Sequence, residues 1–487
     1  MLPFRRFALL LFSFLSSQAL AHAAPSASTS HPFAGIWTGT VTAPNATAEL
    51  SLEFTSGKNG VSASLTMRDM FVHHMPLGPA QIVDETYTLA PLGIRLTRNG
   101  DVLTGTFANP LLEVELHRGV PLSRRLADDS FVLPAPPPLW SRPLGAQVWA
   151  SPVARDGVIY VGCVDGKFHA VGAGDGSELW TWSGPNPLYG EALATENRLW
   201  FLDDHAELVC LDRADGRLVW RTPLHDAKPA AAPAPVNETF NHRVPVPVLA
   251  DGMIYVGSPD QGLYALSASN GKILWRHDAG AAIYASVTLD GDRLIAGCYD
   301  GSLLVLSRRD GAELARTKLG GRIASAPVIA GDMLIVGCRD YLLYGLRRSD
   351  LGVAWRNSYW FSWVESVPRL VDGLLYIGGS DYRRISALNP ATGAARWVTD
   401  VFGLTWGTPV VTADRVYAGT SSQNPAAINH GGGITALDRR TGAVKWRLVT
   451  PLPANADRAG YLGSLVFAGG KIIGAGYEGV IVAYPAN

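Results

Sequence analysis

Short apolar runs of about five residues, separated by turns rich in Gly and Asp, recur along most of the chain. Residues 325–355 contain three such runs and a fourth that ends on a tryptophan. Runs of this length with a turn signal after each predict antiparallel strands joined by tight hairpins. The same four runs recur in residues 151–180, 246–275 and 366–397. A four-stranded repeat of about 40 residues is typical of a β-propeller blade.

The number of blades follows from one position, the tryptophan in the last strand of each repeat. That position is held by Trp140, Trp180, Trp220, Trp275, Ala315, Trp355, Trp397 and Trp446, with one substitution by alanine. The final repeat, residues 463–484, has only three apolar runs, whereas Trp140 stands before the first complete repeat. We therefore expect the strand of Trp140 to complete the last blade. Such a closure makes an eight-bladed ring and removes an exposed sheet edge.

A different pattern precedes the repeats, where apolar and polar residues alternate from about residue 30 to residue 118. Period-two alternation places one face of a strand in a core and the other in water, so it predicts a small antiparallel barrel or sandwich. The opening Gly35-Ile36-Trp37 resembles the start of lipocalin-like domains. Residues 119–138 end in Pro134-Ala-Pro-Pro-Pro138 and predict a linker, because proline cannot donate to a strand ladder. The propeller is expected over residues 139–487, which makes the whole chain all-β.

The first 23 residues have the features of a signal peptide. Arg5 and Arg6 precede a short apolar run, and Ala21-His22-Ala23 supplies a cleavage site. No cysteine occurs before Cys163, so we expect no lipid anchor, and no later apolar run is long enough for a membrane helix. The 41 basic and 42 acidic residues balance, which disfavours a nucleic-acid partner. These features predict a soluble periplasmic or secreted protein, which we expect to be a monomer.

The four cysteines do not have the pattern of a disulfide framework. Cys163, Cys298 and Cys338 occupy the same slot in three different repeats, and Cys210 lies in a third strand. Equivalent slots of a propeller lie too far apart for a disulfide, which needs Cα atoms within about 7 Å. We expect these cysteines to be buried small apolar residues.

The first strands of all blades line the channel of a propeller, so the register of each repeat predicts which side chains meet there. Pro152 and the equivalent position of each repeat define a proline slot. Counting back three positions from this slot selects Trp149, Tyr189, Tyr284, Glu365 and Trp406, and counting back five positions selects His242, Arg322 and Trp363. The predicted ligand-binding residues are Trp149, Tyr189, Tyr284, Trp363 and Trp406, and the candidate catalytic residues are Glu365, His242 and Arg322. Aromatic walls with a few polar groups are typical of small-molecule pockets. Two structural alternatives stay open: the aromatic residues pack between blades, and Glu365 forms an ion pair with Arg322.

The repeat motif is complete as Asp438-Arg-Arg-Thr441-Gly442-Ala-Val-Lys-Trp446. With eight repeats it resembles the pyrroloquinoline-quinone (PQQ)-like propeller family over residues 139–487. The resemblance implies the fold, and the family contains two kinds of protein. Periplasmic quinoprotein dehydrogenases hold PQQ and calcium in the ring, whereas members such as the lipoprotein scaffold of the outer-membrane barrel-assembly machine lack the cofactor. This sequence lacks the adjacent Cys-Cys pair of those dehydrogenases and a Cys-x-x-Cys-His haem site, and no metal ligands can be picked out.

The favoured hypothesis is a periplasmic binding or scaffold protein that holds a small molecule or an extended peptide at the mouth of the ring. A quinoprotein-type oxidoreductase is the first alternative, with PQQ stacked on one of the mouth tryptophans and calcium beside it. The second alternative is an enzyme without a cofactor that uses Glu365, His242 and Arg322.

Overall fold

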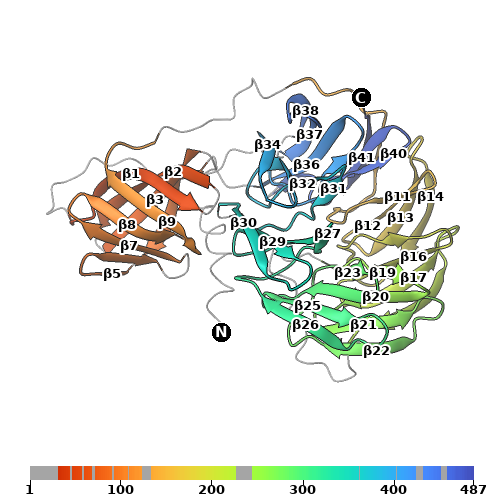
Figure 1. The fold of residues 1–487 in the computed structure, drawn as a ribbon. Coiled ribbons are helices and arrows are strands. Elements are labelled where there is room, and N and C mark those ends of the chain that lie inside the picture. The colour runs from red at the N-terminus through yellow and green to blue at the C-terminus, as the bar shows by residue number, and fades with distance from the viewer. Residues whose placement is uncertain are drawn as a thin grey trace. The chain divides into compact units, whose positions relative to one another are not determined.

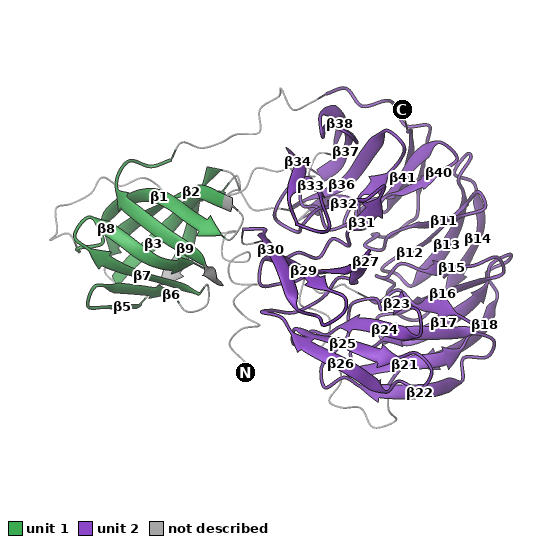
Figure 2. Cartoon of the chain, viewed as in Figure 1, with its two compact units in different colours: residues 1–129, 424–430 green, residues 130–423, 431–487 purple. Residues whose placement is uncertain are grey.

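The chain is all-β in the computed structural model, which describes residues 31–43, 46–57, 60–68, 72–79, 81–89, 93–107, 109–122, 133–225, 244–360, 362–401, 403–423, 432–450 and 458–486 (Figure 1). The predicted signal peptide and His242 lie outside these residues. Within the described part the chain forms no α-helix. Accordingly, none of these residues belongs to a helix that could cross a membrane. The chain divides into two compact units, one holding β1–β9 and the other β10–β42 (Figure 2).

The N-terminal unit is one curled antiparallel sheet of nine strands in the order β4-β3-β2-β1-β9-β8-β7-β6-β5. The strands are β1 (Gly35–Ala43), β2 (Ala46–Gly57), β3 (Gly60–Met67), β4 (Val72–Pro79), β5 (Gln81–Val83), β6 (Thr86–Leu89), β7 (Ile94–Asn99), β8 (Val102–Phe107) and β9 (Asn109–Arg118). Aromatic side chains fill its core. The Trp37 indole is fully buried and donates to the Phe33 carbonyl at 2.7 Å, while Phe54 and Tyr87 pack edge to face at 5.0 Å. The guanidinium of Arg118 covers the Trp37 ring at 4.1 Å.

The second unit is a β-propeller, and the described residues form eight blades, each a four-stranded antiparallel sheet that runs from an inner to an outer strand. The first four blades are β11 (Val153–Arg155), β12 (Val158–Gly162), β13 (Lys167–Gly172) and β14 (Glu178–Ser183); β15 (Leu193–Ala194), β16 (Arg198–Leu202), β17 (Glu207–Asp212) and β18 (Leu218–Pro223); β19 (Val248–Ala250), β20 (Met253–Gly257), β21 (Gly262–Ser267) and β22 (Ile273–Asp278); and β23 (Thr288–Asp290), β24 (Arg293–Gly297), β25 (Ser302–Ser307) and β26 (Glu313–Lys318).

The fifth to seventh blades are β27 (Val328–Ala330), β28 (Met333–Gly337), β29 (Leu342–Arg347) and β30 (Val353–Ser358); β31 (Arg369–Val371), β32 (Leu374–Ile377), β33 (Arg384–Leu388) and β34 (Ala395–Asp400); and β35 (Val410–Val411), β36 (Arg415–Gln423), β37 (Gly432–Asp438) and β38 (Val444–Thr450). An additional strand, β39 (Arg458–Gly460), pairs with the end of β36. The eighth blade is β40 (Val466–Ala468), β41 (Lys471–Ala475), β42 (Val480–Pro485) and β10 (Trp140–Pro143).

The eighth blade confirms the predicted closure of the ring. Its outer strand β10 comes from the start of the propeller and pairs antiparallel with β42 from its end, with Trp140 opposite Ala483 and Pro143 opposite Val480. Backbone bonds continue the ladder on both sides, because Leu139 N–H donates to the Ala483 carbonyl and Leu144 N–H to the Gly479 carbonyl, each at 2.8 Å. The two ends of the propeller therefore hold each other in one sheet.

The tryptophan in the last strand of a blade packs against the next blade, and the glycine of the repeat motif explains how. The Trp180 indole N–H donates to the Arg213 carbonyl of the next blade at 3.1 Å, and its ring lies over Gly216. A Cβ atom on Gly216 would lie 2.4 Å from that ring. The same arrangement recurs in the pairs Trp140/Gly176, Trp220/Gly271, Trp275/Gly311, Trp355/Gly393 and Trp397/Gly442. Glycine is needed here because the turn has a positive φ and the indole occupies the place of a side chain.

Two junctions depart from this rule. Where the tryptophan is replaced by Ala315, the next turn carries Leu351 in the glycine position, still at a φ of 59°. Leu351 is buried and packs with Ile295 and Val305 of the preceding blade. At the last junction no such turn exists, because the third and fourth strands of the eighth blade come from opposite ends of the propeller. There Ala135, in the Pro-rich segment before β10, packs on the cluster that contains Trp446.

All four cysteines are buried and none forms a disulfide, as predicted from their slots. The slot also has a role in the backbone. The carbonyl of Cys163 accepts a hydrogen bond from Leu188 N–H of the next blade, and the carbonyls of Cys298 and Cys338 are used in the same way. Small buried residues at this position thus allow one blade to bond to the next close to the channel.

Candidate functional site

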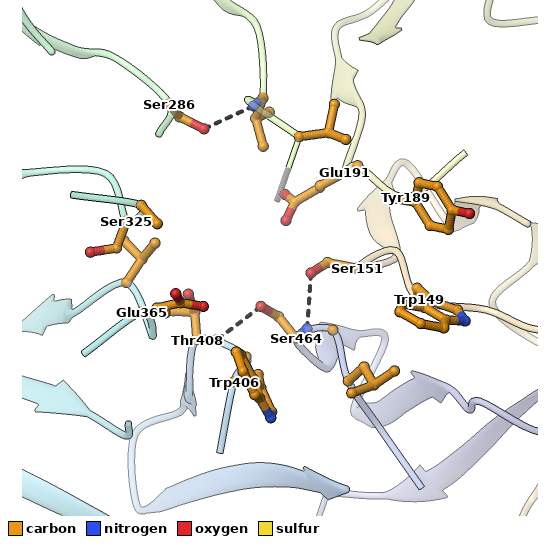
Figure 3. Close-up of a pocket in the computed structure, with 18 of the residues that line it drawn as sticks. Trp149, Ser151, Tyr189, Glu191, Ser286, Ser325, Glu365, Trp406, Thr408 and Ser464 are labelled. Carbon is orange, nitrogen blue, oxygen red and sulfur yellow. Dashed lines mark hydrogen bonds between the residues drawn. The ribbon is translucent and has the colours of Figure 1, made fainter. Parts of the chain in front are cut away.

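The inner ends of all eight blades surround a cavity of about 140 Å³ on the axis of the ring (Figure 3). The lining residues come from the segments just before the inner strands, and they form successive layers along the channel. A layer of aromatic and aliphatic side chains lies at the position three residues before the proline slot. Two residues further along each segment lies a second layer, in which four of the eight side chains carry a hydroxyl: Ser151, Ser286, Thr408 and Ser464.

Four of the five predicted aromatic residues line this cavity: Trp149, Tyr189, Tyr284 and Trp406. Trp149 and Tyr189 lie side by side, with ring centroids 5.7 Å apart in an edge-to-face arrangement. Trp149 also contacts Tyr477 at 5.6 Å, and the guanidinium of Arg458 lies 5.6 Å from the Trp149 ring. Each of the four has surface in the cavity, and Trp149 and Tyr189 also pack on each other across two neighbouring blades.

Of the three residues predicted from five positions before the proline slot, the two that the structure describes do not line the cavity. Trp363 and Arg322 are absent from its lining, and His242 is outside the described residues. Period-two alternation fails here because the chain bends before the inner strands begin. The backbone of this position is bonded to the turn of its own blade, as in Arg339 N–H to the Arg322 carbonyl at 2.9 Å and Ser380 N–H to the Trp363 carbonyl at 2.9 Å.

Glu365 lines the cavity wall, but its carboxylate is held in a buried ion pair with Arg339 and not with Arg322. Arg339 also donates to the Tyr299 hydroxyl at 2.5 Å, and its guanidinium stacks on Trp363 at 4.3 Å. Arg322 instead covers the other part of the Tyr299 ring at 4.7 Å. The expected ion pair therefore exists with a different arginine, because Arg339 follows the second strand of its blade and reaches Glu365 on the neighbouring blade.

The hydroxyl layer joins neighbouring blades, and the sequence reasoning missed it. Ser151 Oγ accepts from Ser464 N–H at 2.9 Å, Ser464 Oγ accepts from Thr408 N–H at 2.9 Å, and Ser286 Oγ accepts from Val246 N–H at 2.8 Å (Figure 3). Continuing the count one step, to the position directly before the proline slot, would have found these residues. They lie on the same side of the alternation as the aromatic layer.

Glu191 occupies the same position in the second blade and is the carboxylate of this layer. Its side chain points toward the middle of the cavity, with Ser151 on one side and Ser286 and Ser325 across from it (Figure 3). Within the part of the chain that the structure describes, this carboxylate forms no hydrogen bond or ion pair. Burial raises the pKa of Glu191 to about 7, and the positive charge of Arg369 partly opposes that rise. At neutral pH the group is therefore close to half ionised.

The residues present do not fit PQQ with calcium. The cavity of about 140 Å³ is close to the volume of about 150 Å³ that holds one benzene molecule, so it does not enclose a tricyclic quinone. No three His, Cys, Asp or Glu side chains gather as a metal site anywhere in the described residues, and calcium takes six to eight oxygen ligands. The cysteines are also separate from one another and from the cavity lining. We derive no reaction step through the quinone.

A family model described as PQQ_2, outer membrane protein assembly factor BamB, matches residues 169–322, 269–361 and 300–487, which together are well over half of the chain. The chain belongs to this family of PQQ-like propellers. Among curated relatives, the outer membrane protein assembly factors BamB of Alkalilimnicola ehrlichii and Yersinia pestis are 29% and 25% identical over 146 and 154 residues, or 30% and 29% of this chain. These matches span about a third of the length of the curated relatives, at 34% and 36%.

Solved structures share the fold at low sequence identity. The quinohemoprotein alcohol dehydrogenase from Comamonas testosteroni is 13% identical with a TM-score of 0.55, covering 74% of this chain and 77% of the enzyme. The computationally designed Ika8 protein is 12% identical with a TM-score of 0.54, covering 72% of this chain and 99% of its own. At this identity the likeness concerns the propeller alone.

Proposed function

We propose that this chain is a periplasmic or secreted binding protein that holds a small molecule or an extended peptide at the mouth of its propeller. One observation carries the proposal: Trp149, Tyr189, Tyr284 and Trp406, from four different blades, converge on a single cavity. Aromatic surface that is held by a rigid scaffold and left partly open is what recognition sites use, because it offers contact area at little entropic cost.

The family favours a protein segment over a metabolite as the ligand. The matching family model and the curated relatives carry the name of an outer membrane protein assembly factor, so a polypeptide partner is the natural candidate in the periplasm. A cavity of about 140 Å³ suits one side chain of such a segment, with the rest of the peptide lying across the mouth. The signal-peptide pattern of residues 1–23 supports export.

The enzyme hypotheses receive less support. Glu365 is neutralised by Arg339, and Arg322 stacks on Tyr299 away from the cavity, so the predicted catalytic residues do not converge on one reacting position. General acid–base catalysis needs a group within hydrogen-bond reach of its substrate.

Panning a random peptide library against the purified protein tests the proposal, followed by affinity measurement for enriched peptides with Trp149→Ala, Trp406→Ala and Trp182→Ala. Trp182 is the matched control because it is half-buried on the outer strand β14 and packs on Phe201, outside the cavity lining. We expect the two mouth variants to lose at least tenfold in affinity and the control to keep it. Peptides that bind all three variants equally, or the absence of any enriched peptide, would refute the proposal.

A further inference from the structure

We infer that the cavity recognises a positively charged amine, such as the ammonium end of a lysine side chain or of an alkylamine, with Glu191 as its counter-ion. The inference rests on the proposed binding function and specifies the chemistry of the group that enters the ring. It starts from the one feature of the cavity that the fold does not explain.

The Glu191 carboxylate has no structural task in the described residues. The hydroxyl groups of its layer accept backbone N–H groups of neighbouring blades and so stabilise the ring, whereas Glu191 forms no such bond. Glu191 is partly buried on the wall of the cavity, and a carboxylate that loses much of its water is stabilised by a positive group or by hydrogen bonds. Because its side chain points into the cavity, the compensating group is expected to come from a ligand (Figure 3).

The charged neighbours do not provide that compensation. Arg369, which begins the inner strand β31, lies close enough to affect the ionisation of Glu191 but forms no ion pair with it. Arg458 lies at the aromatic layer, above the Trp149 ring, and its charge acts on Asp381. Glu365 is bound to Arg339. Glu191 is therefore the carboxylate of the lining that has no ion-pair partner among the described residues.

The remaining surfaces favour an organic ammonium group over a metal ion. An ammonium group has three N–H donors, and the cavity offers acceptors in the Glu191 carboxylate and in hydroxyls such as Ser151 and Ser464. Aromatic side chains of the lining such as Tyr284 and Trp406 attract organic cations. A single carboxylate, in contrast, is too few ligands for calcium. The volume of about 140 Å³ accepts a group with five or six heavy atoms.

The ionisation of Glu191 provides a signature that a merely steric site would lack. The other titratable or charged side chains around it, among the described residues, are Tyr189, Tyr284, Glu365, Arg369 and Arg458. Tyr189 has a pKa raised by burial, so it stays neutral over the relevant range. With a pKa of about 7, Glu191 must lose its proton before it pairs with a cation. The apparent affinity for an amine is thus expected to rise about tenfold between pH 6 and pH 8 and to level off above.

Calorimetry and ligand-observed NMR with n-butylamine and 1-butanol test the inference on the full-length mature protein. The two probes have the same number of heavy atoms, and n-butylamine is protonated throughout because its pKa is close to the value of about 10.4 for lysine. We expect the amine to bind at least tenfold more tightly than the alcohol at pH 8. Glu191→Gln should remove about tenfold to a hundredfold of the amine affinity, with its pH dependence, and leave alcohol binding unchanged.

A second variant, Arg369→Gln, keeps the test informative if Glu191→Gln is poorly folded. Removing this positive charge should strengthen amine binding and move the pH dependence to higher pH, because Arg369 lowers the pKa of Glu191. If Arg369 were instead the true partner of Glu191, the variant would lower the melting temperature and leave amine binding unchanged. Equal binding of both probes, or no binding of either, overturns the inference. The peptide experiment on Trp149 and Trp406 decides separately whether the binding function itself stands.

Discussion

The junction between Ala315 and Leu351 allows a sharp test of how the blades are held together. In six junctions of the described propeller, a tryptophan of one blade covers a glycine of the next, and a Cβ atom there would lie within 2.4–2.7 Å of the ring. At this junction both partners are exchanged: the large side chain is on the turn and the small one on the strand. We predict that the two positions are coupled: Ala315→Trp and Leu351→Gly should each destabilise the protein alone, whereas the two substitutions together should not.

The magnitudes follow from the local contacts. Leu351→Gly removes a buried leucine that packs on Ile295 and Val305, a change worth about 2–5 kcal/mol in a core. Relief of the left-handed backbone at a φ of 59° returns about 1–2 kcal/mol of this. Ala315→Trp alone must displace the Leu351 side chain, an overpacking that costs about 1–3 kcal/mol. The double variant restores the pair seen at the other junctions and should be close to the wild-type stability.

Chemical and thermal unfolding of the four proteins measures this coupling. We expect the double variant to be more stable than the sum of the single effects predicts, by at least about 2 kcal/mol, whereas independent sites add within about 0.5 kcal/mol. Trp275→Ala is a useful reference, because it removes a closing tryptophan whose glycine partner is intact. If the changes in unfolding free energy of Ala315→Trp and Leu351→Gly simply add in the double variant, the indole and the turn residue do not occupy the same space. That result would refute the proposed packing of tryptophan on glycine.

Three further outcomes are expected. Because burial raises the pKa of Glu191 from 4.5 to about 7, its ionisation destabilises the folded protein progressively as the pH rises from about 4.5 to 7; the advantage of Glu191→Gln over the wild type should therefore grow across this range to at most about 3 kcal/mol, and a constant difference would contradict it. Arg339→Met removes the arginine that pairs with the buried Glu365 and should lose about 3–5 kcal/mol of unfolding free energy, most of which the double variant Arg339→Met/Glu365→Leu should recover. Equal losses in the single and the double variant would contradict this expectation. The four thiols are buried, and burial raises the pKa of Cys163, Cys210 and Cys298 to about 12. Burial also raises the pKa of Cys338, so a thiol reagent at pH 8 should react with all four only after unfolding. Rapid labelling of the native protein would contradict this burial.

Much of the fold could be read from local sequence because its rules are local. A blade is built from contiguous hairpins, so periodic apolar runs and Asp-Gly turns are enough to indicate four strands, and a recurring tryptophan is enough to count the blades. The closure by Trp140 was also predictable, since a blade short of one strand and a strand without a blade require each other. The aromatic layer of Trp149, Tyr189, Tyr284 and Trp406 followed from the same register.

The parts that could not be predicted depend on where the backbone bends and on which side chains meet across blades. Alternation holds only while the chain is extended, so Arg322 and Trp363 were placed in the mouth although the bend before the inner strands directs them elsewhere. The pairing of Glu365 with Arg339, 26 residues away, is set by the distance between adjacent blades and not by sequence spacing.

The sequence by itself determined the repeating unit and the number of blades, because both follow from hydrogen bonding and sterics within about 40 residues. Only the tertiary structure decided that the Glu191 carboxylate faces the cavity without an ion-pair partner among the described residues, since the groups that surround it come from other blades. Its raised pKa has the same origin. Ionisation in a channel depends on all the groups that surround it, and those groups come together only when the ring has closed.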